Sequence, residues 1–586
     1  MKGFEYEYLL RQNYELYAFW FWVAGGLGVY WLYLHSDLPV FTFQAMGFIF
    51  LGCAIGRGIR GIIRRSEHKR LMGGNGNPWV VSWMVPKQKV KRRRQLVWLG
   101  KGFPWTQQEI QKATDILNSG PPKFFQKSRG QWIHGLSKER EVEIATKVLE
   151  GHTLIVGSTG TGKTRLFDLL ISQAVYRGEA VIIIDPKGDH DLQEKTRMAC
   201  ERMGEPDRFK FFHPTFSENG VRIDPMKNFQ KGEELASRVA ALIPSETDAD
   251  PFTAFGWMAI NSVVGGLTYM DDKPNLIKLR RYVEGGPDEL LCQTLQKFFN
   301  SRQPGKRLPA KLSEMIKLYQ EVPSQESVRE IDGLINSYLH NREHFQKMVA
   351  SLLPILNMLT SGATGSLLSP EPGDGDVRPV LDSATVIEKN LVLYIGLDNL
   401  SDSTVGSAIG SILLADLTSV AGERYRKSGY NQKPSPVNIF IDEAAEVINE
   451  PAIQLLNKGR GAGFRVAVAT QTLADLEVRT GTKAGARQVI GNVNNWIVLR
   501  VIDGETQKYI AEALPKTAVK TLDQGYRSAS SSEDPLQFTG TYTESLRQEA
   551  TELFPAALLG ILPKMHCFCR FSDGTTWKSE LPILEY

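Results

Sequence analysis

Hydrophobic positions near the start of the chain form two long runs with few polar interruptions. Residues 16–34 carry no charge and are rich in aromatic side chains, close to the roughly 20 residues that a membrane-spanning helix requires. Residues 38–55 are also uncharged, but a proline and two polar residues make this run the weaker candidate. The polar turn at 35–37 leaves room only for a helical hairpin. We therefore predict a two-helix transmembrane anchor within residues 1–70.

Basic residues follow the second run and indicate its orientation. Arginines and lysines between Arg57 and Arg70 favour the cytoplasmic side of a membrane, so both ends of the hairpin are expected in the cytoplasm. A cleaved signal peptide is the alternative. The first run is longer than the apolar region of such a peptide, and no small-residue cleavage site is obvious.

Further along, short continuous apolar runs alternate with helical segments, which is typical of buried parallel strands in an α/β fold. Several runs end in a polar or charged residue, at the sheet edge where ligands bind in open α/β folds. The predicted strands are 154–156, 180–185, 391–396, 437–441, 465–472 and 496–501. A β-hairpin is expected around 572–574 and a Ser-, Asp- and Glu-rich loop at 528–535.

A long helical region interrupts this α/β pattern. Amphipathic spacing predicts helices near 276–282, 290–299, 312–319 and 328–340. We therefore predict an all-α domain at 230–370, inserted in a domain whose two parts are 136–229 and 371–586. This insertion could be a docking surface or a passive lid.

A glycine-rich loop after the first of these strands carries the main chemical signal. It fits the phosphate-binding loop of nucleotide triphosphatases, in which glycines turn backbone N–H groups toward the phosphates. Lys163 would add positive charge at the β- and γ-phosphates of ATP, and the Thr164 hydroxyl would reach Mg²⁺. The residues assigned to nucleotide binding are Gly157, Ser158, Thr159, Gly160, Thr161, Gly162, Lys163, Thr164 and Arg165.

An acidic pair follows the strand at 437–441. Asp442 would order the Mg²⁺ shell and Glu443 would polarise the attacking water. The alternative is that the two acids cap the next helix. Gln471 is a candidate sensor of the γ-phosphate or the water. Arg460, in a glycine-rich turn, is either an arginine finger for a neighbouring subunit or a cation that favours a helix C-terminus.

Residues 71–135 are rich in Gly, Pro and Trp and are predicted to form a cytoplasmic linker with a flexible joint at 73–78. Six basic residues lie within 87–94. This basic run could contact anionic lipid, form a solvated face or contact DNA, and charge alone does not separate these alternatives.

The composition excludes some classes of protein and site but identifies none. A chain of 586 residues is too long for one core. The net charge of +4 excludes a uniformly basic nucleic-acid coat, although a ring could still hold DNA with a few basic groups per subunit. Five scattered cysteines without Cys-x-x-Cys spacing imply neither a disulfide framework nor a zinc site.

Taken in order, these motifs resemble those of the type IV coupling proteins, in particular the TraD type of integrative conjugative elements. The resemblance implies a RecA-like P-loop nucleotide-binding domain with an inserted all-α domain and a two-helix transmembrane anchor. One departure is that no long acidic segment follows the last predicted hairpin. The resemblance rests on the N-terminal hairpin, Gly157–Thr164, Asp185-Pro-Lys-Gly-Asp189, the helical insertion, Ile441-Asp-Glu-Ala-Ala445, Ala469-Thr-Gln-Thr472 and Gly491-Asn-Val-Asn-Asn-Trp496.

The resemblance also implies a function. Such proteins are inner-membrane ATPases of bacteria, usually homo-hexamers, that link a relaxase–DNA complex and its accessory proteins to a type IV secretion channel. They are expected to use ATP and Mg²⁺ to drive transfer of single-stranded DNA, held with little sequence preference. The alternatives are a double-stranded DNA translocase of the chromosome-segregation type, a nucleotide-gated receptor for protein substrates, and a protein exporter of the same family.

Overall fold

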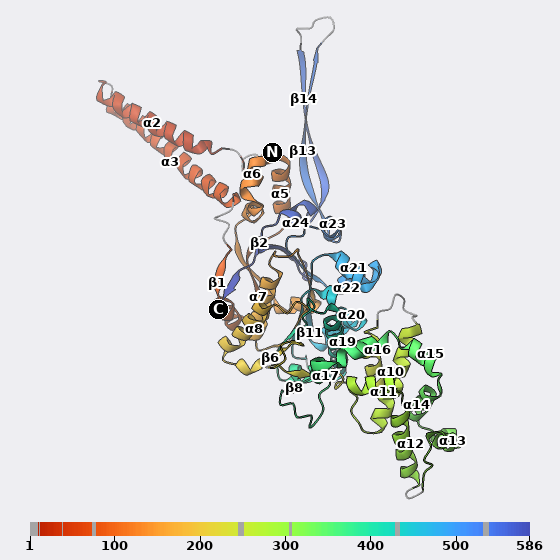
Figure 1. The fold of residues 1–586 in the computed structure, drawn as a ribbon. Helices are drawn as coiled ribbons and strands as arrows, with labels where there is room; N and C mark the ends of the chain where they lie inside the picture. The colour runs from red at the N-terminus through yellow and green to blue at the C-terminus, as the bar shows by residue number, and fades with distance from the viewer. Residues whose placement is uncertain are drawn as a thin grey trace.

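The structure is a computed structural model that describes residues 10, 12–37, 39–72, 78–218, 220–243, 251–303, 307–427, 434–530 and 538–586. Residues 73–77 of the predicted flexible joint and residues 531–535 of the predicted Ser-rich loop lie outside this part of the chain. Figure 1 shows a central α/β body with a helical lobe on one side and two long projections on the other.

A mixed β-sheet forms the centre of the body, with eleven strands in the described residues. Seven neighbouring strands, in the order β12-β4-β11-β10-β5-β9-β6, are parallel, and β3-β2-β16-β15 extend them as antiparallel neighbours. The strands are β2 (Leu96–Pro104), β3 (Arg140–Ala145), β4 (Thr153–Val156), β5 (Ala180–Asp185), β6 (Phe209–Phe212), β9 (Val392–Gly396), β10 (Val437–Ile441), β11 (Phe464–Thr470), β12 (Asn495–Val498), β15 (His566–Arg570) and β16 (Thr576–Glu580).

The continuous apolar strands are explained by burial on both sheet faces. Consecutive residues of β5 point to opposite faces of the sheet, so that Ile182 belongs to one core and Ile183 to the other. One core includes α7 (Lys163–Tyr176) and α8 (His190–Met203), and the other includes α19 (Ser403–Lys427). The six predicted strands correspond to β4, β5, β9, β10, β11 and β12, and the predicted hairpin is β15–β16.

The prediction that residues 71–135 form a linker was wrong for their described part from 78 onward. This segment supplies β2 to the sheet together with α4 (Met84–Arg92), α5 (Gln107–Ser119), α6 (Pro122–Ser128) and the 3-10 helix η1 (Gln131–Leu136). Its glycines serve close strand packing, since a Cβ at Gly100 or Gly102 would lie 2.0 Å from a carbonyl oxygen of β16. The tryptophans Trp98, Trp105 and Trp132 are fully buried.

Part of the basic run is folded against the body. Lys89 of α4 makes ion pairs with Glu141 and Glu143 at 3.0 and 3.2 Å, and Lys87 Nζ donates to the carbonyl of Arg202 at 2.6 Å. Lys87 and Lys89 of the basic run therefore have partners within the protein. Contact of the run with lipid or DNA stays a prediction.

The predicted insertion is a helical lobe, seen in yellow and green in Figure 1. A short parallel pair, β7 (Arg222–Ile223) and β8 (Val380–Leu381), lies beside its two connections to the sheet. A fully buried ion pair at 2.9 Å joins Arg238 in the first helix to Asp416 in α19. The helices are α9 (Gly232–Ala240), α10 (Pro251–Tyr269), α11 (Leu276–Gly285), α12 (Asp288–Arg302), α13 (Leu312–Gln320), α14 (Arg329–Leu339), α15 (Arg342–Met348), α16 (Leu352–Thr360) and α17 (Gly362–Leu368).

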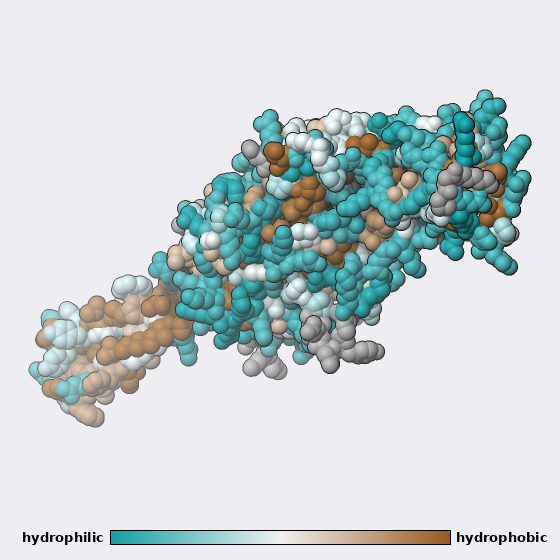
Figure 2. Space-filling view, turned by 90° about the horizontal axis from the view of Figure 1, so that it is seen from below, coloured by the Kyte–Doolittle hydropathy of each residue, from teal (hydrophilic) through white to brown (hydrophobic). Residues whose placement is uncertain are grey.

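The N-terminal pair α2 (Tyr14–Leu34) and α3 (Val40–Leu71) projects from the body (Figure 1), and its surface is largely apolar (Figure 2). Of the described helices, Val40–Leu71 and Ser403–Lys427 are long and apolar enough to cross a membrane, and the second is mostly buried as α19. The first predicted run lies in α2 and the second in α3, and which of the two is the better membrane span stays a prediction. The second helix also continues beyond Ile55 to Leu71, which makes the basic residues a helical extension of the anchor.

A second projection was not predicted. β13 (Lys516–Ser530) and β14 (Phe538–Glu552) form a two-stranded antiparallel hairpin that extends from the same end of the body as the α2–α3 pair (Figure 1). Its side chains are mostly polar and exposed, so it lacks the apolar run that marks the buried strands.

Shorter elements complete the fold around the sheet. They are β1 (Val80–Ser82), which pairs with β17 (Ile583–Glu585), together with η2 (Thr146–Gly151), η3 (Pro206–Arg208), η4 (Ser324–Glu326), α18 (Ser383–Glu388), η5 (Ala444–Glu446), α20 (Glu450–Lys458), η6 (Gly459–Ala462), α21 (Leu473–Thr480), α22 (Lys483–Gly491), α23 (Gly504–Glu512) and α24 (Ala556–Ile561).

Candidate nucleotide site

The glycine-rich loop connects the carboxyl end of β4 to the N-terminus of α7. Neighbouring strand ends fix it, because Gly157 N donates to Thr470 O at 3.3 Å and Ser158 N donates to Arg500 O at 2.9 Å. Gly160 and Gly162 have φ values of 72° and 120°, which are unfavourable for residues with a side chain. Since α7 begins at Lys163, its positive end and free N–H groups lie beside the loop.

Lys163 is buried at this helix start. Its Nζ donates to Gly157 O at 2.6 Å and lies 3.9 Å from Glu443 Oε1. Burial lowers the pKa of Lys163, while the negative charges of Glu443 and Asp442 act in the opposite direction. A phosphate group in front of this amine would therefore meet a poorly solvated cation, which strengthens electrostatic attraction.

Asp442 and Glu443 are both buried where β10 ends. Burial, followed by repulsion from Asp185 and Glu443, raises the pKa of Asp442 to about 6. A divalent cation beside this carboxylate would relieve that cost, so the donor set fits Mg²⁺. The helix-cap alternative is not supported, because Glu443 at the N-cap of η5 makes no side-chain capping bond.

The carboxylate of Glu443 is the centre of a hydrogen-bonded chain. Its Oε1 accepts from Lys187 Nζ at 2.6 Å and from Gln471 Nε2 at 2.8 Å. The other end of the Gln471 amide accepts from Thr159 Oγ1 at 2.8 Å. Glu443 has a left-handed φ of 44°, an uncommon conformation for a residue with a side chain, so its placement is enforced by the surrounding structure.

Lys187 was not assigned a role from the sequence. The lysine lies in the Asp185–Asp189 segment, which the strand pattern had placed at the sheet edge but without a partner. Fully buried Asp185 fixes this turn, since its carboxylate accepts from Lys187 N at 3.0 Å, Asp189 N at 2.8 Å and the Tyr394 hydroxyl at 2.6 Å.

A cavity of about 1190 Å³ lies in front of the loop, α7 and Asp442. Gly157 and Thr161 support the loop from behind, whereas Arg165 lines the cavity and pairs with Asp191 at 2.7 Å. Basic residues from segments far apart in the sequence also line it, which sequence patterns do not reveal. The lining residues from the loop, the sheet edge and these basic segments are Ser158, Thr159, Gly160, Gly162, Lys163, Thr164, Arg165, Lys187, Asp442, Lys127, Arg129, Arg500 and Lys564.

Arg460 lies away from this cavity. It belongs to η6, just before β11 begins, whereas Gln471 directly follows the other end of that strand. Arg460 lines a separate cavity of about 480 Å³ with Asn494, Trp496 and Arg570. A role in the site of its own chain is therefore excluded by position, and a role toward a neighbouring subunit stays a prediction.

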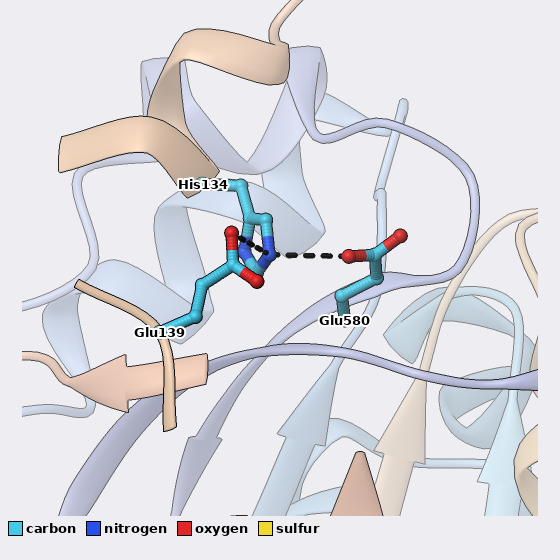
Figure 3. A group of neighbouring side chains, drawn as sticks. All are labelled: His134, Glu139 and Glu580. Atoms are coloured by element: carbon cyan, nitrogen blue, oxygen red, sulfur yellow. Dashed lines mark ion pairs between the residues drawn. The ribbon is translucent and has the colours of Figure 1, made fainter. Parts of the chain in front are cut away.

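A second polar cluster consists of His134, Glu139 and Glu580 (Figure 3), and its Glu580 also lines the nucleotide cavity. His134 Nε2 lies 3.2 Å from Glu139 Oε1 and 3.1 Å from Glu580 Oε2, a set of donors that could hold a metal ion. Fully buried Lys578 lies beside this cluster, with its Nζ 2.9 Å from His566 Nδ1. Because the lysine already supplies positive charge near the two carboxylates, the cluster is balanced by the protein's own side chains.

Comparisons with known proteins found two family models and a curated relative. A family model described as "TraM recognition site of TraD and TraG" matches residues 436–564, and one described as "Helicase HerA, central domain" matches residues 134–247. The type 4 coupling protein DotL of Legionella pneumophila is 22% identical over 472 residues, which cover 72% of this chain and 57% of DotL. The chain thus spans less than two thirds of the length of this relative.

Solved structures of the coupling protein TrwB have the same fold. The unbound form of TrwBdeltaN70 is 17% identical, with a TM-score of 0.51 over 76% of this chain and 88% of that one. TrwB in complex with the GTP analogue GDPNP is 17% identical, with a TM-score of 0.50 over 75% and 87%. TrwB has also been solved with ADP and Mg²⁺, at 16% identity and a TM-score of 0.49 over 75% and 87%. By its ordered motifs and these matches, the chain is similar to the type IV coupling proteins, and it has the α/β P-loop fold of TrwB.

Proposed function

We propose that this protein is an inner-membrane ATPase that couples a relaxase–DNA complex to a type IV secretion channel and drives transfer of single-stranded DNA. The observation that carries the proposal is that one chain joins an apolar helical pair to a cavity lined by Lys163 and Asp442, with Glu443 beside it at 3.9 Å from the Lys163 amine. An anchor beside a hydrolytic site suits a motor that works at a membrane channel.

The roles of the site residues follow from their positions. The start of α7 and Lys163 would bind the β- and γ-phosphates of ATP, and Glu443 would accept a proton from the attacking water. Thr164 and Asp442 line the same cavity and would hold Mg²⁺, which when bound neutralises charge on the phosphate oxygens. Gln471, which already contacts Glu443, would report on the γ-phosphate or the water.

Assembly and partners extend the proposal. A homo-hexamer would bring Arg460 of one subunit toward the nucleotide of the next, where it would stabilise charge on the transferring phosphoryl group. The match to a TraM recognition site at 436–564 supports an accessory protein as a partner of this region. The DNA strand itself would be held by phosphate contacts and stacking.

ATP hydrolysis by the full chain in detergent tests this function. We expect hydrolysis that depends on Mg²⁺, that single-stranded DNA stimulates more than duplex DNA, and that Lys163→Ala abolishes. Hydrolysis that single-stranded DNA leaves unchanged, in a chain that still assembles, would contradict DNA transfer and favour a receptor or exporter of proteins. Preferential stimulation by duplex DNA would favour the double-strand translocase.

A further inference from the structure

Lys187 is a second cation in the nucleotide cavity, and its surroundings differ from those of Lys163. The exposed fractions of the two side chains are 43% for Lys187 and 8% for Lys163. Both amines face Glu443, at 2.6 Å and 3.9 Å respectively. The buried lysine is fixed beside the loop, whereas the exposed lysine can move from the carboxylate to another anion in the same cavity.

The backbone of Lys187 is held while its amine stays free to exchange. Its N–H is bound by Asp185, which the Tyr394 hydroxyl and Asp189 N also contact. Movement of the lysine is therefore confined to its side chain. The flexible stem of a lysine is suited to such a change of partner.

The bond to Lys187 also restrains Glu443. The Oε1 atom that accepts from Lys187 accepts from Gln471 as well, so this oxygen already has two donors. A carboxylate oxygen engaged in this way has less capacity to accept a proton from water. Removing the lysine from Glu443 would restore that capacity.

We propose that Lys187 contacts the γ-phosphate of a nucleoside triphosphate and acts as a positioning residue that releases Glu443 when it does so. The proposal rests on the ATPase function proposed above. A terminal phosphate carries more negative charge than one carboxylate and offers several acceptor oxygens, so it competes well for the amine. A nucleoside diphosphate lacks that group and leaves Lys187 on Glu443. Lys187 thereby distinguishes a triphosphate from a diphosphate. Glu443 is released only when a triphosphate binds.

Nucleotide affinities of the full chain in detergent with Mg²⁺ test the proposal. Calorimetric titrations with ADP and with the imido analogue of ATP give the ratio of the two dissociation constants for each variant. Lys187→Met should weaken analogue binding about tenfold or more, as expected for one hydrogen bond to a charged group, and change ADP binding less than twofold. Lys187→Arg should keep most of the preference, and Lys147→Met at an exposed lysine is the matched control.

A second variant tests the competition itself. Glu443→Gln removes the competing negative charge, so it should tighten binding of the analogue severalfold without changing that of ADP. Adding Lys187→Met to this variant should cancel the gain.

The outcomes separate this proposal from the function on which it rests. An unchanged affinity ratio in Lys187→Met, an equal loss of ADP binding, or no preference for the analogue in the wild type would each overturn the role of Lys187. A wild-type chain that binds neither nucleotide would instead overturn the proposed ATPase function.

Discussion

Glu443→Gln tests the chemical step of ATP hydrolysis. Glutamine has the size of glutamate, and its amide oxygen can still accept from Lys187 and Gln471, now at 2.6 and 2.8 Å from Oε1 of Glu443. A neutral amide, unlike a carboxylate, has no atom basic enough to take the proton from water. The local packing and the hydrogen-bonded chain should therefore survive, while the general base is lost.

The expected loss follows from the role of a general base, which contributes roughly 10² to 10⁴ in rate, or about 3 to 5 kcal/mol in the barrier. The assay is steady-state ATP hydrolysis by the full chain, with nucleotide affinity measured in parallel. Glu446→Gln, at an exposed acid three residues later, is the matched control and should stay within twofold of the wild type. A Glu443→Gln variant that retains more than a tenth of the wild-type rate would refute the assignment of the base.

Other variants test the packing around the site. Burial raises the pKa of Asp168 in α7 from 3.8 to about 7. The folded state therefore holds a proton that the unfolded state releases, and the free energy of unfolding should fall by about 4 kcal/mol as the pH rises from about 4 to 7. Asp168→Asn should remove this dependence, so its melting temperature should exceed that of the wild type by more at pH 8 than at pH 5. Arg238→Met leaves Asp416 buried without its partner and should cost about 3 to 5 kcal/mol in unfolding free energy, whereas adding Asp416→Leu should restore most of the lost melting temperature. Gly162→Ala should weaken nucleotide binding tenfold or more by calorimetry, because its Cβ would lie 2.8 Å from Met565 Sδ and its φ is 120°; trimming with Met565→Ala should not rescue it, since the backbone strain remains.

The fold was predictable wherever burial leaves a mark on the sequence. Strands buried on both faces appear as continuous apolar runs, which is why β5 and β10 were found with nearly their observed bounds. β2 was missed because glycines that suggest a loop serve close strand contacts at Gly100 and Gly102. The β13–β14 hairpin was missed because its exposed strands leave no apolar pattern.

The site was predictable only as far as its motifs are local. Lys163, Asp442 and Gln471 each lie at the end of a recognisable strand or loop, so a parallel sheet brings them together. The partner of Glu443 was not predictable, because the 2.6 Å bond to Lys187 joins residues 256 positions apart. Nothing in the spacing of the sequence indicates which side of the sheet edge that amine faces.

The helical pair α2–α3 is structurally continuous with the nucleotide cavity. Leu71, the last residue of α3, is buried in the main core, and Arg70 Nε donates to Gly135 O of η1 at 2.8 Å. Gln131, at the start of the same η1, lines the cavity, as does Met72 directly after α3. A shift of η1 on nucleotide binding would therefore press on the end of the helix that leads to the membrane. Because removing α2 and α3 would also expose this part of the core, we expect the pair to affect nucleotide binding as well as any attachment to a membrane.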